Sequence, residues 1–365
     1  MARVKVGVIG TGVIAQVMHL HFLRELSERF ETAAICDLSM ESARANADAY
    51  GVDAVYTDWR EMMSSDLDAV LVLTSGSHAP LAIEAARRGL HVFVEKPMCF
   101  SSAEAQQMVD AASDAGVTLM VGYPKRYDPA FERFRDLATT VGEPRLLRVT
   151  TTEAPWQPYL VHYPMIAPGA VDPAVLAGLR SDAAARLAAG IGTDDPELTG
   201  FYQGILLDTL VHELNTVRGV WGEPERLEHV DRRPGALNVL LGYGDASAAI
   251  HWLDVPGMTR YAMEFSLTGT DGRVTLSFPS PYLRNAPTSL VVERGTSVDV
   301  ASTSTEELTS YESGFKRELV AFHEAITSGN PAPTDGRDGS RDIALCQAIV
   351  RSLVTRTPID HPTES

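Results

Sequence analysis

Close to the amino terminus the chain reads Val4-Lys5-Val6-Gly7-Val8-Ile9-Gly10-Thr11-Gly12-Val13-Ile14-Ala15, and this stretch decides the fold. Its first half is a short apolar run rich in β-branched residues, which is typical of a buried strand. Its second half is a G-x-G-x-x-A turn that leads into a helical pattern. The stretch therefore predicts a strand, a tight turn and a helix.

The turn has the spacing that accommodates the pyrophosphate of a dinucleotide. Gly10 allows the tight turn, Gly12 lets the backbone approach the phosphates, and the small Ala15 lets helix and strand pack closely. The amino terminus of the helix then faces the phosphate charge. An empty turn of the same shape is the alternative. The expected cofactor contacts of the turn are Gly10, Thr11, Gly12, Val13 and Ile14.

A second apolar run, 32–36, ends at Asp37. The position of this acid favours a turn that binds a dinucleotide over an empty turn. It is close to the offset of about twenty residues at which an acid binds the adenosine ribose. The carboxylate would repel a 2′-phosphate, and no arginine lies in Leu38-Ser39-Met40 to attract one. We therefore expect NAD rather than NADP, with Asp37 and Leu38 at the ribose.

Composition limits the classes of partner. The 365 residues are enough for two domains, and the formal net charge of -17 argues against nucleic acid or an anionic membrane as a partner. The cysteines, at 36, 99 and 346, have neither metal spacing nor a disulfide framework. No export signal or membrane-spanning apolar run is recognisable. These features predict a cytoplasmic protein.

Residues 1–125 alternate between strand and helix patterns. The expected strands after the first are 32–36, 68–74, 90–95 and 117–122, and the expected helices include 39–50, 80–88 and one that begins at 101. Such alternation is typical of a parallel sheet with helices on both faces. The sequence therefore predicts a doubly wound α/β Rossmann domain over 1–125.

The pattern changes to successive strands at about 143. The expected strands are 145–152, 236–242, 247–253, 261–268, 273–278 and 289–293, with a helix at 205–220 and closing helices at 315–327 and 341–354. Turn signals between several of the strands favour hairpins. We expect an α+β domain over 126–330 with a large, mostly antiparallel open sheet. Residues 331–365 are expected to form a helix that returns towards the Rossmann domain.

An insertion at about 154–204 fits neither pattern. It is rich in proline, glycine, alanine and aspartate, and loops of this length are usually functional or disordered. We expect its aromatic residues Trp156 and Tyr163 to bind the substrate. Its helical piece 181–189 could form an arm on a neighbouring subunit. A surface excursion without a role is the alternative.

Glu95-Lys96-Pro97 stands at the carboxyl end of a predicted parallel strand. Ligands bind at this end of the strands in such sheets, so Lys96 would face the nicotinamide end of the cleft. A structural Glu-Lys pair with a turn proline is the alternative.

Asp208 and His212 are four residues apart within a predicted helix, which places both side chains on one face. Such a pair could orient an imidazole for proton transfer near neutral pH. A buried structural histidine and a pair of metal ligands are the alternatives. Because no third Cys, His or carboxylate recurs at metal spacing, we expect no metal ion.

Together, the Gly-rich turn, Glu-Lys-Pro after the strand expected at 90–95, the Asp-x-x-x-His helix and the closing helix pair resemble one family. It comprises the glucose-fructose oxidoreductases, inositol dehydrogenases and MocA proteins (Gfo/Idh/MocA). The resemblance covers the chain apart from the insertion. Thr74-Ser75-Gly76-Ser77-His78 resembles the family's Thr-Pro-Asn-x-x-His loop beneath the nicotinamide, and 122–129 resembles its Gly-Phe-x-x-Arg-Phe-Asp-Pro segment beside the substrate.

The resemblance implies roles for individual residues. Lys96 would contact the substrate hydroxyl and the cofactor, His212 would be the general base, and Asp208 would orient them. Further implied cofactor contacts are Thr74, Ser75, His78, Glu95 and Lys96, and the implied substrate contacts are Lys96, Tyr123, Lys125, Arg126, Asp208 and His212. This chain departs from the family's pattern where Ser75-Gly76 replaces Pro-Asn.

We therefore expect an NAD-dependent dehydrogenase that acts on a secondary alcohol of a sugar, an inositol-like cyclitol or a related polyol. A biosynthetic amino-sugar or nucleotide-sugar dehydrogenase or ketoreductase is one alternative, and a non-catalytic NAD-binding regulatory protein is another. Alternating apolar residues at 248–253 and the family resemblance both predict a homodimer or homotetramer joined through the second sheet.

Overall fold

The computed structural model describes residues 3–296, 298 and 300–364, which form two compact units. The first unit contains the chain up to Tyr123 together with Tyr163–Asp208 and Phe315–Ile343. The second contains Pro124–His162, Thr209–Gly314 and the chain from Ala344 onward. Much of the insertion and the first closing helix therefore belong to the amino-terminal unit.

The first unit is built on a six-stranded sheet in the order β3-β2-β1-β4-β5-β6. All neighbouring strands pair in parallel, which confirms the predicted Rossmann sheet. The strands are β1 (Val4–Ile9), β2 (Phe30–Cys36), β3 (Ala54–Tyr56), β4 (Ala69–Val72), β5 (His91–Glu95) and β6 (Leu119–Gly122). Sequence reasoning missed β3, because three half-buried residues are too few to show a period.

Helices cover this sheet in the order that the alternation predicts. They are the π-helix η1 (Ala15–His19), α1 (Leu20–Glu25), α2 (Met40–Tyr50), α3 (Trp59–Met62), α4 (Ala79–Arg87) and α5 (Ser102–Ala115). The unit also contains α8 (Pro173–Ile191), α9 (Pro196–Phe201) and α11 (Gly314–Ser328), which lie outside the stretch that the alternation covers. The four-residue α3 was not predicted. The capping box at the start of α5 is half formed, since Ser101 Oγ accepts from Glu104 N at 3.2 Å, whereas the Glu104 carboxylate accepts from Phe100 N instead.

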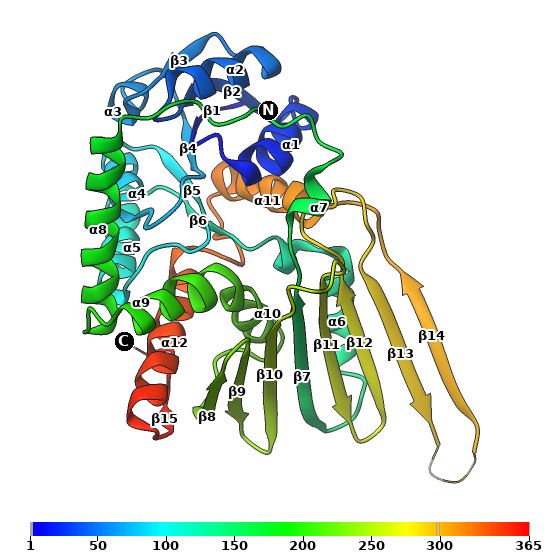
Figure 1. Ribbon diagram of the computed structural model, residues 1–365. Helices are drawn as coiled ribbons and strands as arrows, with labels where there is room; N and C mark the ends of the chain where they lie inside the picture. The colour runs from blue at the N-terminus through cyan, green and yellow to red at the C-terminus, as the bar shows by residue number, and fades with distance from the viewer. Residues whose placement is uncertain (1–2, 297, 299, 365) are drawn as a thin grey trace. The chain divides into compact units, whose positions relative to one another are not determined.

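The helical piece expected at 181–189 is the centre of the much longer α8. Asp172 caps its amino terminus by accepting from Ala174 N at 2.8 Å, and Pro173 occupies the first turn. Arg186 forms an ion pair with Glu104 of α5 at 2.8 Å, and α8 runs alongside α5 in Figure 1. The structure thus packs this helix on the first unit of its own chain, and its role as an arm on a neighbouring subunit stays a prediction.

The second unit is built on a nine-stranded sheet in the order β14-β13-β12-β11-β7-β10-β9-β8-β15. Only the central pair of β7 and β10 is parallel, which confirms a mostly antiparallel sheet. The strands are β7 (Pro144–Glu153), β8 (Arg226–Arg233), β9 (Ala236–Tyr243), β10 (Ala246–Asp254), β11 (Ala262–Gly269), β12 (Gly272–Phe278), β13 (Ser289–Gly295), β14 (Ser302–Leu308) and β15 (Ile359–Asp360). The sequence did not reveal β8, β14 and β15, because they are charged, polar or very short.

Helices of the second unit include η2 (Pro124–Tyr127), α6 (Pro129–Ala138), α7 (Gln157–Leu160) and α10 (Val211–Trp221), and α12 (Gly336–Thr355) spans both units. The helix expected at 205–220 begins earlier, as the π-helix η3 (Tyr202–Leu210), and continues as α10. Within the described residues, no helix is long and apolar enough to cross a membrane.

Candidate active site

The Gly-rich turn joins β1 to η1 and has the shape of a phosphate-binding loop. Gly10 has a φ of +94°, and a Cβ there would lie 3.0 Å from the backbone of Leu73 and Thr74, so this position requires glycine. A Cβ at Gly12 would meet nothing within 4 Å. The space beside Gly12 would let a pyrophosphate approach the backbone closely, whereas Gly10 packs against the neighbouring backbone.

Asp37 follows β2 and faces this turn, as the sequence predicts. Its Oδ2 accepts from the Thr11 amide at 2.9 Å and from the Thr11 hydroxyl at 2.7 Å, and its Oδ1 accepts from Ser39 N at 3.0 Å. Leu38, beside it, is exposed. The structure therefore brings the predicted pyrophosphate and ribose residues together at one edge of the sheet.

His78 fastens the loop after β4 to the Glu-Lys-Pro turn. Its Nε2 lies 2.7 Å from the carbonyl oxygen of Thr74, and its Nδ1 lies 2.8 Å from that of Pro97. Burial lowers the pKa of His78 below its usual value, although both carbonyls act in the opposite direction. Because both ring nitrogens contact carbonyl oxygens of the protein, His78 helps to fix the position of the loop that contains Thr74 and Ser75. Its direct contact with a cofactor stays a prediction.

Lys96 and Asp208 meet in the first unit, although 112 residues separate them. The Lys96 ammonium donates to Asp208 Oδ1 at 2.8 Å and to the Asp208 carbonyl oxygen at 2.6 Å. Lys96 follows β5, and Asp208 lies on the π-helix η3, a helix type that is frequent at functional sites. The ion pair remains accessible to solvent, so a ligand can reach the ammonium.

His212 follows Asp208 by four residues in the same continuous helical segment, where η3 gives way to α10. Sequence reasoning assumed an α-helix over both residues, and the π-helical turn at Asp208 was not predictable from the pattern. The structure confirms that both residues lie on one helical segment.

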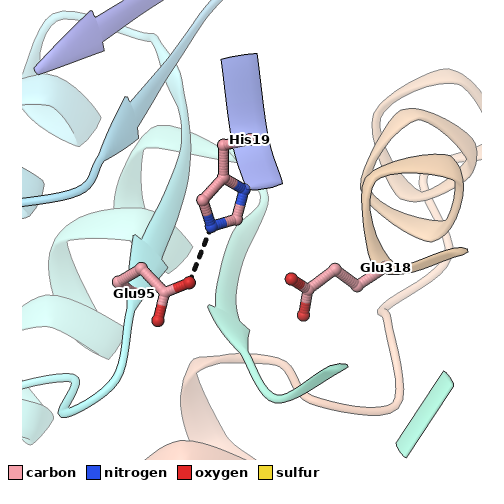
Figure 2. Close-up of side chains that lie close together, drawn as sticks. All are labelled: His19, Glu95 and Glu318. Carbon is pink, nitrogen blue, oxygen red and sulfur yellow. Dashed lines mark hydrogen bonds and ion pairs between the residues drawn. The ribbon is translucent and has the colours of Figure 1, made fainter. Parts of the chain in front are cut away.

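A buried cluster in the first unit includes Glu95, the residue that precedes Lys96 (Figure 2). It consists of His19 at the end of η1, Glu95 at the end of β5 and Glu318 on α11, all of them buried. His19 Nε2 donates to Glu95 Oε1 at 2.6 Å, and Glu95 Oε2 accepts from the Lys96 amide at 3.1 Å. Burial alone would raise the pKa of Glu95, but the hydrogen bond and charge of His19, with the charge of Lys96, hold it below its usual value.

His19 and Glu318 were not among the residues that the sequence singled out. Nothing in the sequence indicated that His19, Glu95 and Glu318 meet, because the three residues are far apart in the chain. Their ligand atoms lie within 4.8 Å of one another, which is close enough to hold a metal ion. The expectation of no metal rested on spacing along the sequence, which carries no information about this cluster.

The second unit contains a buried carboxyl group that the sequence did not single out. Glu213, next to His212 on α10, accepts from the Thr151 hydroxyl at 2.6 Å. Burial raises the pKa of Glu213 to about 7, and the nearby Glu153 adds to the rise, whereas the Thr151 hydrogen bond and Lys125 oppose it. Glu213 therefore changes its protonation state in the range in which a histidine base would also titrate.

Glu213→Gln is expected to stabilise the protein at alkaline pH. The unfolded chain releases this proton near pH 4.5, whereas the folded protein keeps it until about pH 7, so the free energy of unfolding of the wild type falls as pH rises through that window. The variant lacks this fall and should exceed the wild type by up to about 3 kcal/mol above pH 7, with no difference at pH 4. Thermal unfolding between pH 4 and 8 measures this, with the exposed Glu225→Gln as control. Parallel curves for Glu213→Gln and wild type would contradict it.

The remaining predicted substrate residues lie in different places. Arg126 donates to the carbonyl and side-chain oxygens of Asn215 at 3.3 Å, so α10 holds its guanidinium. Lys125 is buried, with its ammonium 6.0 Å from the ring centre of Phe278. The other three are Tyr123, which is buried at the end of the first unit, the exposed Trp156 in the second unit, and Tyr163 in the first unit. Their contact with a substrate stays a prediction.

Comparison with known proteins covers both units. Residues 4–123 match the family model described as the NAD-binding Rossmann fold of an oxidoreductase family (GFO_IDH_MocA), and residues 194–360 match the C-terminal alpha/beta domain of the same family. Myo-inositol 2-dehydrogenase from Thermotoga maritima is 25% identical over 96% of this chain and 96% of that protein.

Solved structures share the fold. A levoglucosan dehydrogenase in complex with NADH and L-sorbose superimposes with a TM-score of 0.76, with 19% identity, over 99% of this chain and 100% of that chain. A 3-ketoreductase from Actinomadura kijaniata in complex with NADP gives a TM-score of 0.69, with 20% identity, over 97% of both chains. At these identities the structural likeness concerns the fold alone.

Proposed function

Because the chain belongs to the Gfo/Idh/MocA oxidoreductase family, we propose that it is an NAD-dependent dehydrogenase of a secondary alcohol on a sugar, a cyclitol or a related polyol. The observation that carries this proposal is the Lys96–Asp208 ion pair at the carboxyl end of β5. A protein that only bound the dinucleotide would have no need of an accessible ammonium group held at this position. The names of relatives such as myo-inositol 2-dehydrogenase support the substrate class.

The roles of the residues follow from their chemistry. The Gly-rich turn and Asp37 would hold NAD, which would supply a hydride acceptor for the carbinol carbon. His212 removes the hydroxyl proton, so that the alcohol becomes a ketone and the imidazole becomes an imidazolium. Lys96 donates a hydrogen bond to the substrate oxygen as negative charge develops there. Asp208 holds the Lys96 ammonium in place through the 2.8 Å contact. The reverse reaction would reduce a keto-sugar.

NADH is expected to bind about 10- to 100-fold more tightly than NADPH, since a hydrogen bond to a charged group is worth about 1.5–3 kcal/mol. Asp37 is the reason, because its carboxylate binds the ribose hydroxyls and repels a 2′-phosphate. Family likeness does not decide this choice, since the similar structures hold NADH in one case and NADP in another. Asp37→Ala should reduce the difference in affinity between NADH and NADPH. Asp53→Ala, at an exposed carboxylate of the same unit, should leave this difference unchanged. Titration calorimetry measures both cofactors, and tighter binding of NADPH by the wild type would refute the preference.

A substrate screen tests the function itself. Cyclitols, hexoses and amino sugars are offered with NAD, and the corresponding keto-sugars with NADH, while absorbance at the NADH band is followed. Turnover of a polyol or keto-sugar is the expected result. Preferential turnover of an amino sugar would favour the biosynthetic alternative. Tight NAD binding without turnover of any compound would favour a regulatory protein.

We also propose that the protein is a homodimer or homotetramer joined through the second sheet. On β10, Ala248, Ile250 and Trp252 are buried, whereas Leu253 is exposed on the opposite face. A second copy would cover apolar groups on that face. Light scattering at micromolar concentration should give a mass of two or four chains, and the mass of one chain would contradict the proposal.

A further inference from the structure

Residues 164–170, which we call the strap, lead into α8 and cross the first turns of two helices of the first unit (Figure 1, the green line that runs to α8). The first anchor is Gln16 on η1. Ile166 N donates to Gln16 Oε1 at 2.8 Å, and Gln16 Nε2 donates to the carbonyl oxygens of Ile166 at 3.2 Å and Thr11 at 2.8 Å. One side chain thus joins the strap to the Gly-rich turn.

The second anchor is the amino-terminal turn of α2. Gly169 N donates to Ser42 Oγ at 2.7 Å. A Cβ at Gly169 would lie 2.2 Å from Ser39 Oγ and 2.9 Å from Glu41 Cβ, so only glycine allows this approach. The strap therefore lies against the residues that directly follow Asp37.

The chain beyond the strap is also fastened to the first unit. Arg186 of α8 pairs with Glu104 at 2.8 Å, and the Tyr202 hydroxyl donates to the Phe100 carbonyl oxygen at 3.0 Å. Pro164 and Pro168 restrict the backbone of the strap itself. The strap is thus a short segment of restricted conformation, anchored at Gln16 and Ser42 and continued by a packed helix.

The two anchors are adjacent to the residues proposed to bind the dinucleotide. Thr11, which accepts from Gln16, donates through its amide and hydroxyl to Asp37. Ser39 Oγ accepts from Ser42 N at 3.3 Å, and Ser42 Oγ accepts from Gly169. The hydroxyl oxygens of Ser39 and Ser42 are therefore held in place by the helix cap and the strap, close to Asp37 in the chain.

We propose that the strap is part of the cofactor site: it closes the adenosine-ribose side of bound NAD and sets the rate at which the dinucleotide leaves. The proposal rests on the proposed function, because it needs a dinucleotide at the Gly-rich turn. The Gln16 and Ser42 hydrogen bonds must open before the ribose can leave. Weakening them speeds release without removing any group that contacts the cofactor.

The test is the rate constant of NADH release, followed by fluorescence after a chase with excess NAD. Gln16→Ala and Ser42→Ala should each raise it about 5- to 10-fold, the effect of losing a hydrogen bond that contributes modestly to stability. Gly169→Ala changes the strap itself and should have a similar effect, because its methyl group meets Ser39 Oγ. Gln106→Ala, at an exposed glutamine whose side chain donates only to Asp110, is the matched control.

A second measurement separates a role in the site from a general loss of structure. Hydrogen exchange of 164–170 should slow when NADH binds to the wild type and should stay fast in Gln16→Ala, whose exchange elsewhere matches the wild type. Release rates of all three variants within twofold of the wild type, with NADH bound normally, would overturn the strap alone. A wild-type protein that binds no dinucleotide in calorimetry would overturn the proposed function and the strap together.

Discussion

Lys96→Ala is expected to lower kcat by about 10²–10⁴-fold, the usual cost of removing a group that stabilises charge or moves a proton in the transition state. The ammonium is accessible, and two oxygens of Asp208 hold it at 2.6 and 2.8 Å. In the proposed function this ammonium donates to the substrate oxygen. NADH affinity should change far less than kcat, because the proposed cofactor contacts centre on the Gly-rich turn and Asp37.

Steady-state kinetics with the best substrate of the screen measure the loss. Lys96→Arg keeps the charge but not the compact ammonium, so it should recover only part of the rate. Lys5→Ala is the control, since Lys5 forms an ion pair with Asp66 on the surface of the same unit. A kcat of Lys96→Ala within a few-fold of the wild type would remove Lys96 from the catalytic set and leave its pair with Asp208 a structural one.

His212→Asn is expected to slow alcohol oxidation and to flatten its pH profile. A histidine base must be neutral to accept the hydroxyl proton, so log kcat/KM of the wild type should rise through the histidine range, about pH 6 to 8. Without the imidazole the proposed base that titrates in this range is lost, so the rising limb should disappear. The profile is measured from pH 5 to 9 at saturating NAD, with His229→Asn, at an exposed histidine of the second unit, as control.

Glu213 offers a specific check on this assignment, because burial raises its pKa to about 7, into the same range. If His212 is the base, Glu213→Gln keeps the rising limb and His212→Asn loses it. If the rising limb disappears in Glu213→Gln and persists in His212→Asn, the group that titrates is instead the Glu213 carboxyl. An unchanged profile in both variants would move the base role to Lys96 or to Tyr123.

The amino-acid sequence determined those features that depend on neighbouring residues. The buried strand β1 and the turn at Gly10 follow from an apolar run and from glycines whose spacing has a steric cause. The alternation over residues 1–125 predicted the parallel sheet, and the hairpin signals predicted most of the antiparallel one. Short or polar strands such as β3 and β14 were missed, because pairing with a neighbouring strand, and not their own pattern, makes them strands.

Only the tertiary structure decided which distant residues meet. The cluster of His19, Glu95 and Glu318 comes from three elements far apart in the chain. Likewise, the sequence could not show that the strap of the insertion lies on Gln16 and Ser42, beside the proposed cofactor residues. Periodicity and turn chemistry report the local backbone, whereas hydrogen bonds such as these depend on the packing of whole elements, to which no short stretch of sequence is sensitive.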